Sequence, residues 1–350
     1  MALISQARPM MKMQLLGDSG LRVSQLCLGT MTFGEDWGWG ASKEVSREIF
    51  DAYVEAGGNF IDTASPYTNG TSEKFIGEFV ATDRDSFVVA TKFTLPDQFE
   101  EIQPATKVGN ARKNLRRSIE ASLKRLNTDH IDVLYLHVWD FTTPTDEIMR
   151  TLDDLVTSGK VLYLGISDTP AWIVARAQTT AQFRGWTPFS VLQIEYSLIE
   201  RTVERDLIPM ADALGMTVAP WSPLAGGVLS GKYSSGEQTN RGRDVPERSL
   251  QIAKIVGEQA EKTGCTPSQL SLAWLLAKNT IPILGARKTD QFKDNLGCLD
   301  VKISPETMQT LDEASKIEPG FPHDFLHGDF VQQRVLGGKK ELLDGISPRA

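Results

Sequence analysis

The chain has 350 residues, 41% hydrophobic and 23% charged, which is typical of a globular protein and excludes a disordered, collagenous or coiled-coil chain. Its 45 acidic residues outnumber the 37 basic ones, and the net charge of −8 argues against general binding to nucleic acid or anionic membranes. Cys27, Cys265 and Cys298 are far apart, which predicts neither a disulfide framework nor a metal site and suits the reducing cytoplasm. No run of 18 apolar residues occurs, so we expect no membrane span.

The N-terminal part of the chain is expected to contain an extension and a hairpin. Residues 1–11 carry no apolar leader or cleavage signature, and we expect a short disordered extension there. Two short apolar segments, 13–16 and 21–25, flank Gly17-Asp-Ser-Gly20, a pattern that predicts a β-hairpin. We place this hairpin across the bottom of the domain that follows, and we expect residues 12–350 to form a single domain.

Eight short apolar runs follow along the chain, and each is continuous rather than alternating, as expected of strands buried on both faces. Segments with helical spacing of apolar residues lie between most of them. Eight such units predict a (β/α)8 barrel, whereas the competing doubly wound sheet lacks its G-x-G-x-x-G fingerprint. The predicted strands are 26–31, 59–63, 87–93, 131–137, 161–167, 191–196, 216–221 and 281–285. The predicted helices are 43–56, 110–126, 146–157, 171–181, 203–214, 250–262 and 267–278.

Three segments are longer than ordinary connections: residues 34–42 after the first strand, 222–249 after the seventh, and 318–350 at the end of the chain. Long loops in a compact domain are usually functional or disordered. Because βα loops line the active face of a barrel, we expect long loops at the C-terminal face.

Ionisable side chains stand at the C-terminal ends of three successive predicted strands. Asp62 ends the second strand, Lys92 the third and His137 the fourth, and Tyr67 follows Asp62 by five residues. Any one of them could serve packing alone, but four on one barrel rim are harder to explain in that way. The sequence therefore predicts one polar site at this rim.

These four residue types are suited to general acid catalysis. A phenol is a proton donor, and we expect the ammonium of Lys92 to lower its pKa while Asp62 holds that ammonium in place. A histidine can donate a hydrogen bond to a carbonyl oxygen that is becoming an alkoxide. The set contains no obvious nucleophile for a carbonyl carbon, and a hydride from a nicotinamide is the natural candidate.

The motifs around these residues resemble the aldo-keto reductase family, and look most like its aryl-alcohol-dehydrogenase-like bacterial and fungal branch. The resemblance implies a (β/α)8 barrel, a tetrad of Asp62, Tyr67, Lys92 and His137, and NADPH/NADP+ as cofactor. It implies an enzyme that reversibly reduces a small-molecule aldehyde or ketone to an alcohol, with Tyr67 as general acid. The matching segments are Phe60-Ile-Asp62-Thr-Ala, Ala90-Thr-Lys92, Ile131-Asp-Val-Leu-Tyr-Leu-His137, Gly165-Ile-Ser-Asp168, Gln193-Ile-Glu-Tyr-Ser197, Trp221-Ser-Pro-Leu224 and Gly285-Ala-Arg287.

At the nicotinamide end, the polar groups of Ser167, Asp168 and Gln193 could hold a carboxamide, which needs one donor and one acceptor. Many relatives carry Asn at the position of Asp168, and a carboxylate there can accept but cannot donate. Trp221 stands where relatives often place an aromatic ring against the nicotinamide. The competing interpretation of Trp221 is that it only packs in the core. The competing interpretation of Gln193 is a buried amide whose hydrogen bonds are satisfied by the backbone.

At the phosphate end, Gly226, Gly231 and Lys232 belong to a segment that misses the P-loop pattern, because Tyr233 replaces its hydroxyl residue. The resemblance implies that this segment covers the pyrophosphate, that Arg287 meets the 2′-phosphate, and that Gln291 and Asn295 lie near the adenine. A merely solvated helix start is the competing interpretation of Arg287. The other positions implied for the cofactor are Gly29, Thr30, Met31, Asp62, Ser222, Pro223, Leu224 and Gly285.

The substrate side is marked by three tryptophans on predicted βα loops, Trp37, Trp39 and Trp139, which predict an aromatic or otherwise apolar substrate surface unless they only anchor loops. Two other functions stay open from the sequence. One is a Schiff-base aldolase that uses Lys92. The other is a cofactor-sensing regulatory subunit with little turnover.

Overall fold

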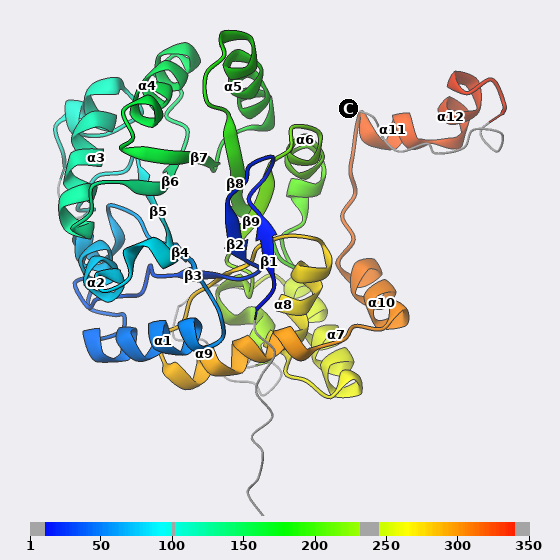
Figure 1. Ribbon diagram of the computed structural model, residues 1–350. Helices are drawn as coiled ribbons and strands as arrows, with labels where there is room; N and C mark the ends of the chain where they lie inside the picture. The colour runs from blue at the N-terminus through cyan, green and yellow to red at the C-terminus, as the bar shows by residue number, and fades with distance from the viewer. Residues whose placement is uncertain (1–10, 100–101, 232–244, 340–350) are drawn as a thin grey trace, which may run out of the picture.

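Eight parallel strands form the wall of a barrel, as the sequence predicts, and helices surround it (Figure 1). The computed structural model describes residues 11–99, 102–231 and 245–339. The strand order is β10-β3-β4-β5-β6-β7-β8-β9, and the barrel closes where the Ile281 N–H donates to the Val218 carbonyl at 3.0 Å. The strands are β3 (Cys27–Gly29), β4 (Phe60–Asp62), β5 (Val88–Phe93), β6 (Ile131–Leu136), β7 (Val161–Ser167), β8 (Phe189–Glu195), β9 (Thr217–Trp221) and β10 (Ile283–Leu284).

The helices cover the outside of the barrel, and α2 and α10 among them, like α11 and α12 in the tail, were not expected from the sequence. In α2, Gly77 weakens the helical signal, but a Cβ there would lie 2.4 Å from the carbonyl oxygen of Leu126, so close helix packing requires the glycine. The helices are α1 (Lys43–Glu55), α2 (Thr71–Val80), α3 (Arg112–Leu126), α4 (Thr145–Thr157), α5 (Ala171–Arg184), α6 (Leu207–Ala213), α7 (Glu247–Thr263), α8 (Pro267–Ala277), α9 (Thr289–Leu296), α10 (Pro305–Ser315), α11 (His323–His327) and α12 (Asp329–Val335).

The predicted hairpin, β1 (Met13–Leu15) and β2 (Arg22–Ser24), closes the N-terminal end of the barrel. Its Leu16 and Val23 side chains are fully buried and extend the apolar core inside the barrel. The N–H of Gly17 donates to the hydroxyl of Thr217, at the first residue of β9, over 2.7 Å. The barrel strands begin at this closed end. Their C-terminal ends, which carry the polar side chains, therefore lie at the opposite, open rim.

The ends of the chain differ in part from expectation. Met11, which we assigned to the disordered extension, is buried and its N–H donates to the Ala56 carbonyl, since the hairpin brings it against α1. The predicted tail 318–350 contains α11 and α12, which Figure 1 shows projecting away from the barrel. Within the described residues, no helix is both long and apolar enough to cross a membrane. We infer a single domain, because every described strand belongs to the hairpin or to the barrel.

The hydroxyl of Tyr53 on α1 joins three parts of the fold. Its single proton is shared between the carbonyls of Leu26 and Phe60, at 2.9 and 2.7 Å, and its oxygen accepts from the Phe60 N–H at 2.9 Å and contacts the Ser24 hydroxyl at 2.8 Å. Tyr53 is fully buried, so water cannot replace these bonds. The hairpin, α1 and β4 therefore share one buried polar centre.

We expect Tyr53→Phe to lower the free energy of unfolding by about 1–3 kcal/mol, because it leaves buried backbone groups without partners. The measurement is urea unfolding followed by circular dichroism. Tyr163→Phe is the matched control, since the Tyr163 hydroxyl makes no hydrogen bond within the described residues. Equal stabilities of the two variants would contradict a structural role for the Tyr53 hydroxyl.

Candidate active site

Strand register brings the predicted tetrad to one rim of the barrel. Asp62 is the last residue of β4 and lies beside Ala90 of β5, two residues before Lys92. His137 directly follows β6, and its backbone N–H donates to the Phe93 carbonyl at the end of β5. Three neighbouring parallel strands thus present their polar residues at the same edge, which is the active face of such barrels.

Lys92 is the centre of the site. Its ammonium is fully buried and donates to Asp62 Oδ2 at 2.5 Å, to the Thr63 carbonyl at 3.0 Å and to the Tyr67 hydroxyl at 3.0 Å. An ammonium has three N–H donors, so each one has a partner. Burial acts to lower the pKa of Lys92, but Asp62 and Tyr67 outweigh it and raise the pKa above its ordinary value. The amine is therefore held charged, which is unsuited to a Schiff-base nucleophile.

Tyr67 stands at the start of a tight turn. Thr68 and Asn69 both have left-handed backbone angles (φ 44° and 54°), and the Thr68 hydroxyl donates to the Phe33 carbonyl at 2.5 Å. Burial raises the pKa of Tyr67 above its ordinary value; Lys92 lowers this pKa, as expected, but only in part, so the net shift is upward. Because Lys92 donates to the phenolic oxygen, the phenolic proton stays free for another acceptor.

His137 lies against Tyr67, with ring centroids 6.1 Å apart and an interplanar angle of 79°. Burial, and then the charge of Lys92, lower the pKa of His137 well below its ordinary value, so the imidazole is neutral. Its Nδ1 is buried and has no hydrogen-bond partner within the described residues. A neutral imidazole carries one N–H, which a carbonyl oxygen could accept.

Gln193, which we predict to hold the carboxamide, has a partner within the protein. This buried side chain of β8 donates from Nε2 to Asp62 Oδ1 at 2.9 Å. The sequence also gave no reason to include Tyr135, a fully buried tyrosine of β6 in the barrel interior. Gly165 lies beside Tyr135 in the sheet, and a Cβ there would lie 2.4 Å from the Tyr135 ring. This glycine was therefore the signal in the sequence that a large side chain occupies the neighbouring strand.

The remaining cofactor candidates are arranged around the same rim. Asp168 accepts from the Trp221 indole at 3.1 Å, so this pair of nicotinamide-end candidates is joined. Arg287 is exposed and has no carboxylate partner within the described residues. Lys232 lies outside the described residues. Buried candidates are Gly29, Thr30, Ser167, Pro223 and Asn295, half-buried ones are Ser222, Leu224 and Gly231, and exposed ones are Met31, Gly226, Gly285 and Gln291.

Two of the three predicted substrate tryptophans form an aromatic cluster. The rings of Trp37 and Trp39 lie 5.5 Å apart, and Phe99, which was not predicted from the sequence, lies 6.0 Å from Trp37. The Trp37 indole donates to the Asn69 side chain at 3.4 Å, which places the cluster beside the Tyr67 turn. Trp139 is not part of this cluster; it packs against the outer apolar core, and its backbone N–H donates to the Asp168 carbonyl at 3.4 Å.

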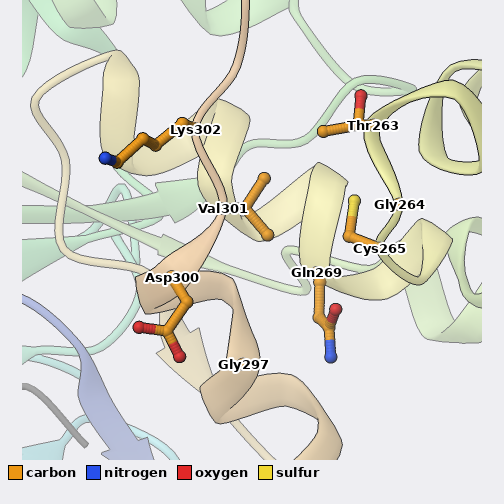
Figure 2. Close-up of a pocket in the computed structure, with 8 residues that line it drawn as sticks. All are labelled: Thr263, Gly264, Cys265, Gln269, Gly297, Asp300, Val301 and Lys302. Carbon is orange, nitrogen blue, oxygen red and sulfur yellow. The ribbon is translucent and has the colours of Figure 1, made fainter.

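The described surface includes two cavities of similar volume. One of about 420 Å³ adjoins the ends of β5 and β6, and its wall includes Leu95, Val108 and Val138, which follows His137 directly. The other, of about 470 Å³, lies where α7 and α8 meet the turn after α9 (Figure 2), and contains no predicted site residue. No metal-binding cluster of histidine, cysteine or acidic residues occurs in the described parts of the chain.

Comparison with known proteins identifies the family. The model described as "Aldo/keto reductase family" matches residues 25–316, and the chain belongs to this family of carbonyl oxidoreductases. A norsolorinic acid reductase of Aspergillus flavus is 39% identical over 329 residues, covering 89% of this chain and 83% of the relative. An aryl-alcohol dehydrogenase (NADP(+)) of Phanerodontia chrysosporium is 40% identical over 351 residues, covering 92% of this chain and 90% of the relative.

We expect Lys92→Met to destabilise the protein by about 3–5 kcal/mol near neutral pH, because it leaves the buried Asp62 carboxylate without its cation. The folded-state pKa of that carboxyl should then exceed its unfolded value, so protonation should reduce the deficit as the pH falls. Urea unfolding across pH measures this effect.

Lys43→Met is the control, because its ion pair with Glu78 is about half exposed (47% and 57%) and such pairs contribute about 0–1 kcal/mol. A Lys92→Met deficit no larger than that of the control would contradict the buried ion pair.

Proposed function

We propose that this protein is an NADP(H)-dependent oxidoreductase that interconverts an aldehyde or ketone with an alcohol, using Tyr67 as the general acid. The observation that carries the proposal is the Lys92–Tyr67 hydrogen bond. Lys92 donates to the phenolic oxygen at 3.0 Å, which leaves the phenolic proton for a substrate oxygen. The ammonium also stabilises the phenolate that remains after proton transfer.

The residues at the rim fit a phosphorylated dinucleotide. Arg287 is exposed beside the first turn of α9 and has no carboxylate partner within the described residues, so its guanidinium is available to a phosphate. Gly226 and Gly231 have left-handed backbone angles (φ 65° and 82°), so this segment can approach a ligand without side chains in the way. The name of the Phanerodontia relative, an NADP(+) enzyme, agrees with this assignment. When bound, the nicotinamide supplies or accepts a hydride.

The other members of the tetrad have distinct tasks in this proposal. Neutral His137 donates a hydrogen bond to the carbonyl oxygen and orients it toward Tyr67. Asp62 keeps Lys92 charged and in place. The cavity whose wall includes Val138, the residue after His137, and the Trp37 cluster favour a substrate with an apolar or aromatic substituent. The charged state of Lys92 is the reason to prefer this chemistry over a Schiff-base aldolase.

We expect Tyr67→Phe to lower kcat for carbonyl reduction by roughly 10²–10⁴-fold, because it removes the proton donor and keeps the ring. NADPH affinity should change little. The assay follows NADPH consumption with aromatic and aliphatic aldehydes and ketones, and Tyr163→Phe serves as control. A variant that keeps a tenth of wild-type turnover would contradict the role of Tyr67. Tight NADPH binding by a wild type without turnover on any of these substrates would instead favour a regulatory subunit.

We expect Arg287→Ala to weaken NADPH binding by about 10- to 150-fold, since hydrogen bonds to charged groups contribute roughly 1.5–3 kcal/mol. NADH lacks the 2′-phosphate, so its binding should weaken only a few-fold. Fluorescence titration of both cofactors measures the difference. Lys288→Ala is the matched control, because a lysine offers a point charge rather than a two-pronged donor. Equal losses for both cofactors would show that Arg287 does not contact the phosphate.

A further inference from the structure

We propose that Gln193 is a positioning residue for the proton-transfer group, which fixes Asp62 from the opposite side of the barrel and thereby fixes Lys92 and Tyr67. The proposal rests on the proposed function of Tyr67. Gln193 touches neither Lys92 nor Tyr67 by hydrogen bond, and it acts through Asp62. One N–H of its Nε2 donates to Asp62 Oδ1 at 2.9 Å, which leaves the second N–H and Oε1 for other partners.

The contact spans the interior of the barrel. β4 and β8 are four positions apart in the ring of eight strands, so Asp62 and Gln193 come from opposite walls. Both residues are 3% exposed, and water has little access to either. Asp62 thus has one carboxylate oxygen on Gln193 and the other on Lys92, which fixes the plane of the carboxylate.

The residue type at position 193 is matched to this task. An amide N–H satisfies Asp62 Oδ1 without adding charge, so the Lys92–Asp62 pair stays neutral overall. A second cation there would compete with Lys92 for Asp62, and an apolar side chain would leave a buried carboxylate oxygen unpaired. Lys92 is then held 3.0 Å from the Tyr67 oxygen by a carboxylate that cannot rotate.

The surroundings of Asp62 make the contact testable by pH. Burial raises the pKa of Cys27 and of Tyr135, so both stay neutral across the working range and Lys92 is the charged neighbour. Gln193→Glu would place a second carboxyl against Asp62, and two carboxyls at this distance share one proton with one raised pKa. The titratable groups that act on Asp62 are Cys27 of β3, Tyr67, Lys92 of β5 and Tyr135 of β6.

The experiment measures Gln193→Glu with and without cofactor. In the cofactor-free protein, we expect the loss in the urea midpoint to be large at about pH 9 and to shrink toward about pH 6, because the shared proton stabilises the folded state. In turnover assays, kcat should gain a new basic limb that falls about tenfold per pH unit above the pKa of the carboxyl pair. A role confined to the cofactor carboxamide produces neither effect.

Two further variants separate this contact from general effects of burying a carboxylate. Gln178→Glu is the matched control, since Gln178 is equally buried but pairs with the Phe189 backbone and with no carboxylate. Adding Asp62→Asn unpairs Lys92 in both proteins, so it should reduce the pH dependence of the urea midpoint more in the Gln193→Glu protein than in the Gln178→Glu protein. Equal responses of the two proteins to Asp62→Asn would overturn the proposal.

Gln193→Met gives a second measurement if the glutamate variant does not fold. We expect kcat to fall at least tenfold and the NADPH dissociation constant to change less than kcat. A loss of cofactor affinity as large as the loss of kcat would overturn the positioning role. Because the urea measurement needs no substrate, it tests the contact with Asp62 even if the protein reduces no carbonyl compound.

Discussion

The burial of one ammonium group governs the architecture of this site. A charged lysine inside a protein is costly unless every donor is satisfied, and Lys92 satisfies its three donors with Asp62, Thr63 and Tyr67. The requirement fixes the phenolic oxygen as firmly as it fixes the carboxylate. In the proposed function, the group that must be paired for the fold to be stable is also the group that prepares Tyr67 to give up its proton.

The barrel makes this arrangement possible by bringing distant segments to one rim. Asp62 and Lys92 come from adjacent strands, and Gln193 reaches them from the opposite wall. The hairpin closes the other end, where Leu16 and Val23 extend the inner core. Water is thus excluded from below the site, which strengthens the interactions among the charged groups, while the loops above the rim carry the aromatic and phosphate-binding candidates.

The sequence predicted the parts of this structure that depend on local patterns. Continuous apolar runs identified the eight strands, and a polar residue at the end of each of three strands identified Asp62, Lys92 and His137. The sequence did not predict that Gln193 faces Asp62, because these residues are 131 positions apart and strand patterns do not show which side chains meet across a barrel. The net direction of the Tyr67 pKa shift was missed for a related reason. Burial outweighs the charge of Lys92 here, and how deeply a side chain is buried depends on packing that the sequence does not show.

The most direct test of the account is the ionisation of Tyr67 in the cofactor-free protein. Tyrosine labelled with ¹³C at Cζ reports the phenol and phenolate forms separately by NMR, and comparison with Tyr67→Phe assigns the signal. The account predicts that Tyr67 stays a neutral phenol through the pH range in which an ordinary tyrosine, with a pKa of about 10, begins to ionise. A phenolate at neutral pH would contradict the claim that Tyr67 stands ready as a proton donor.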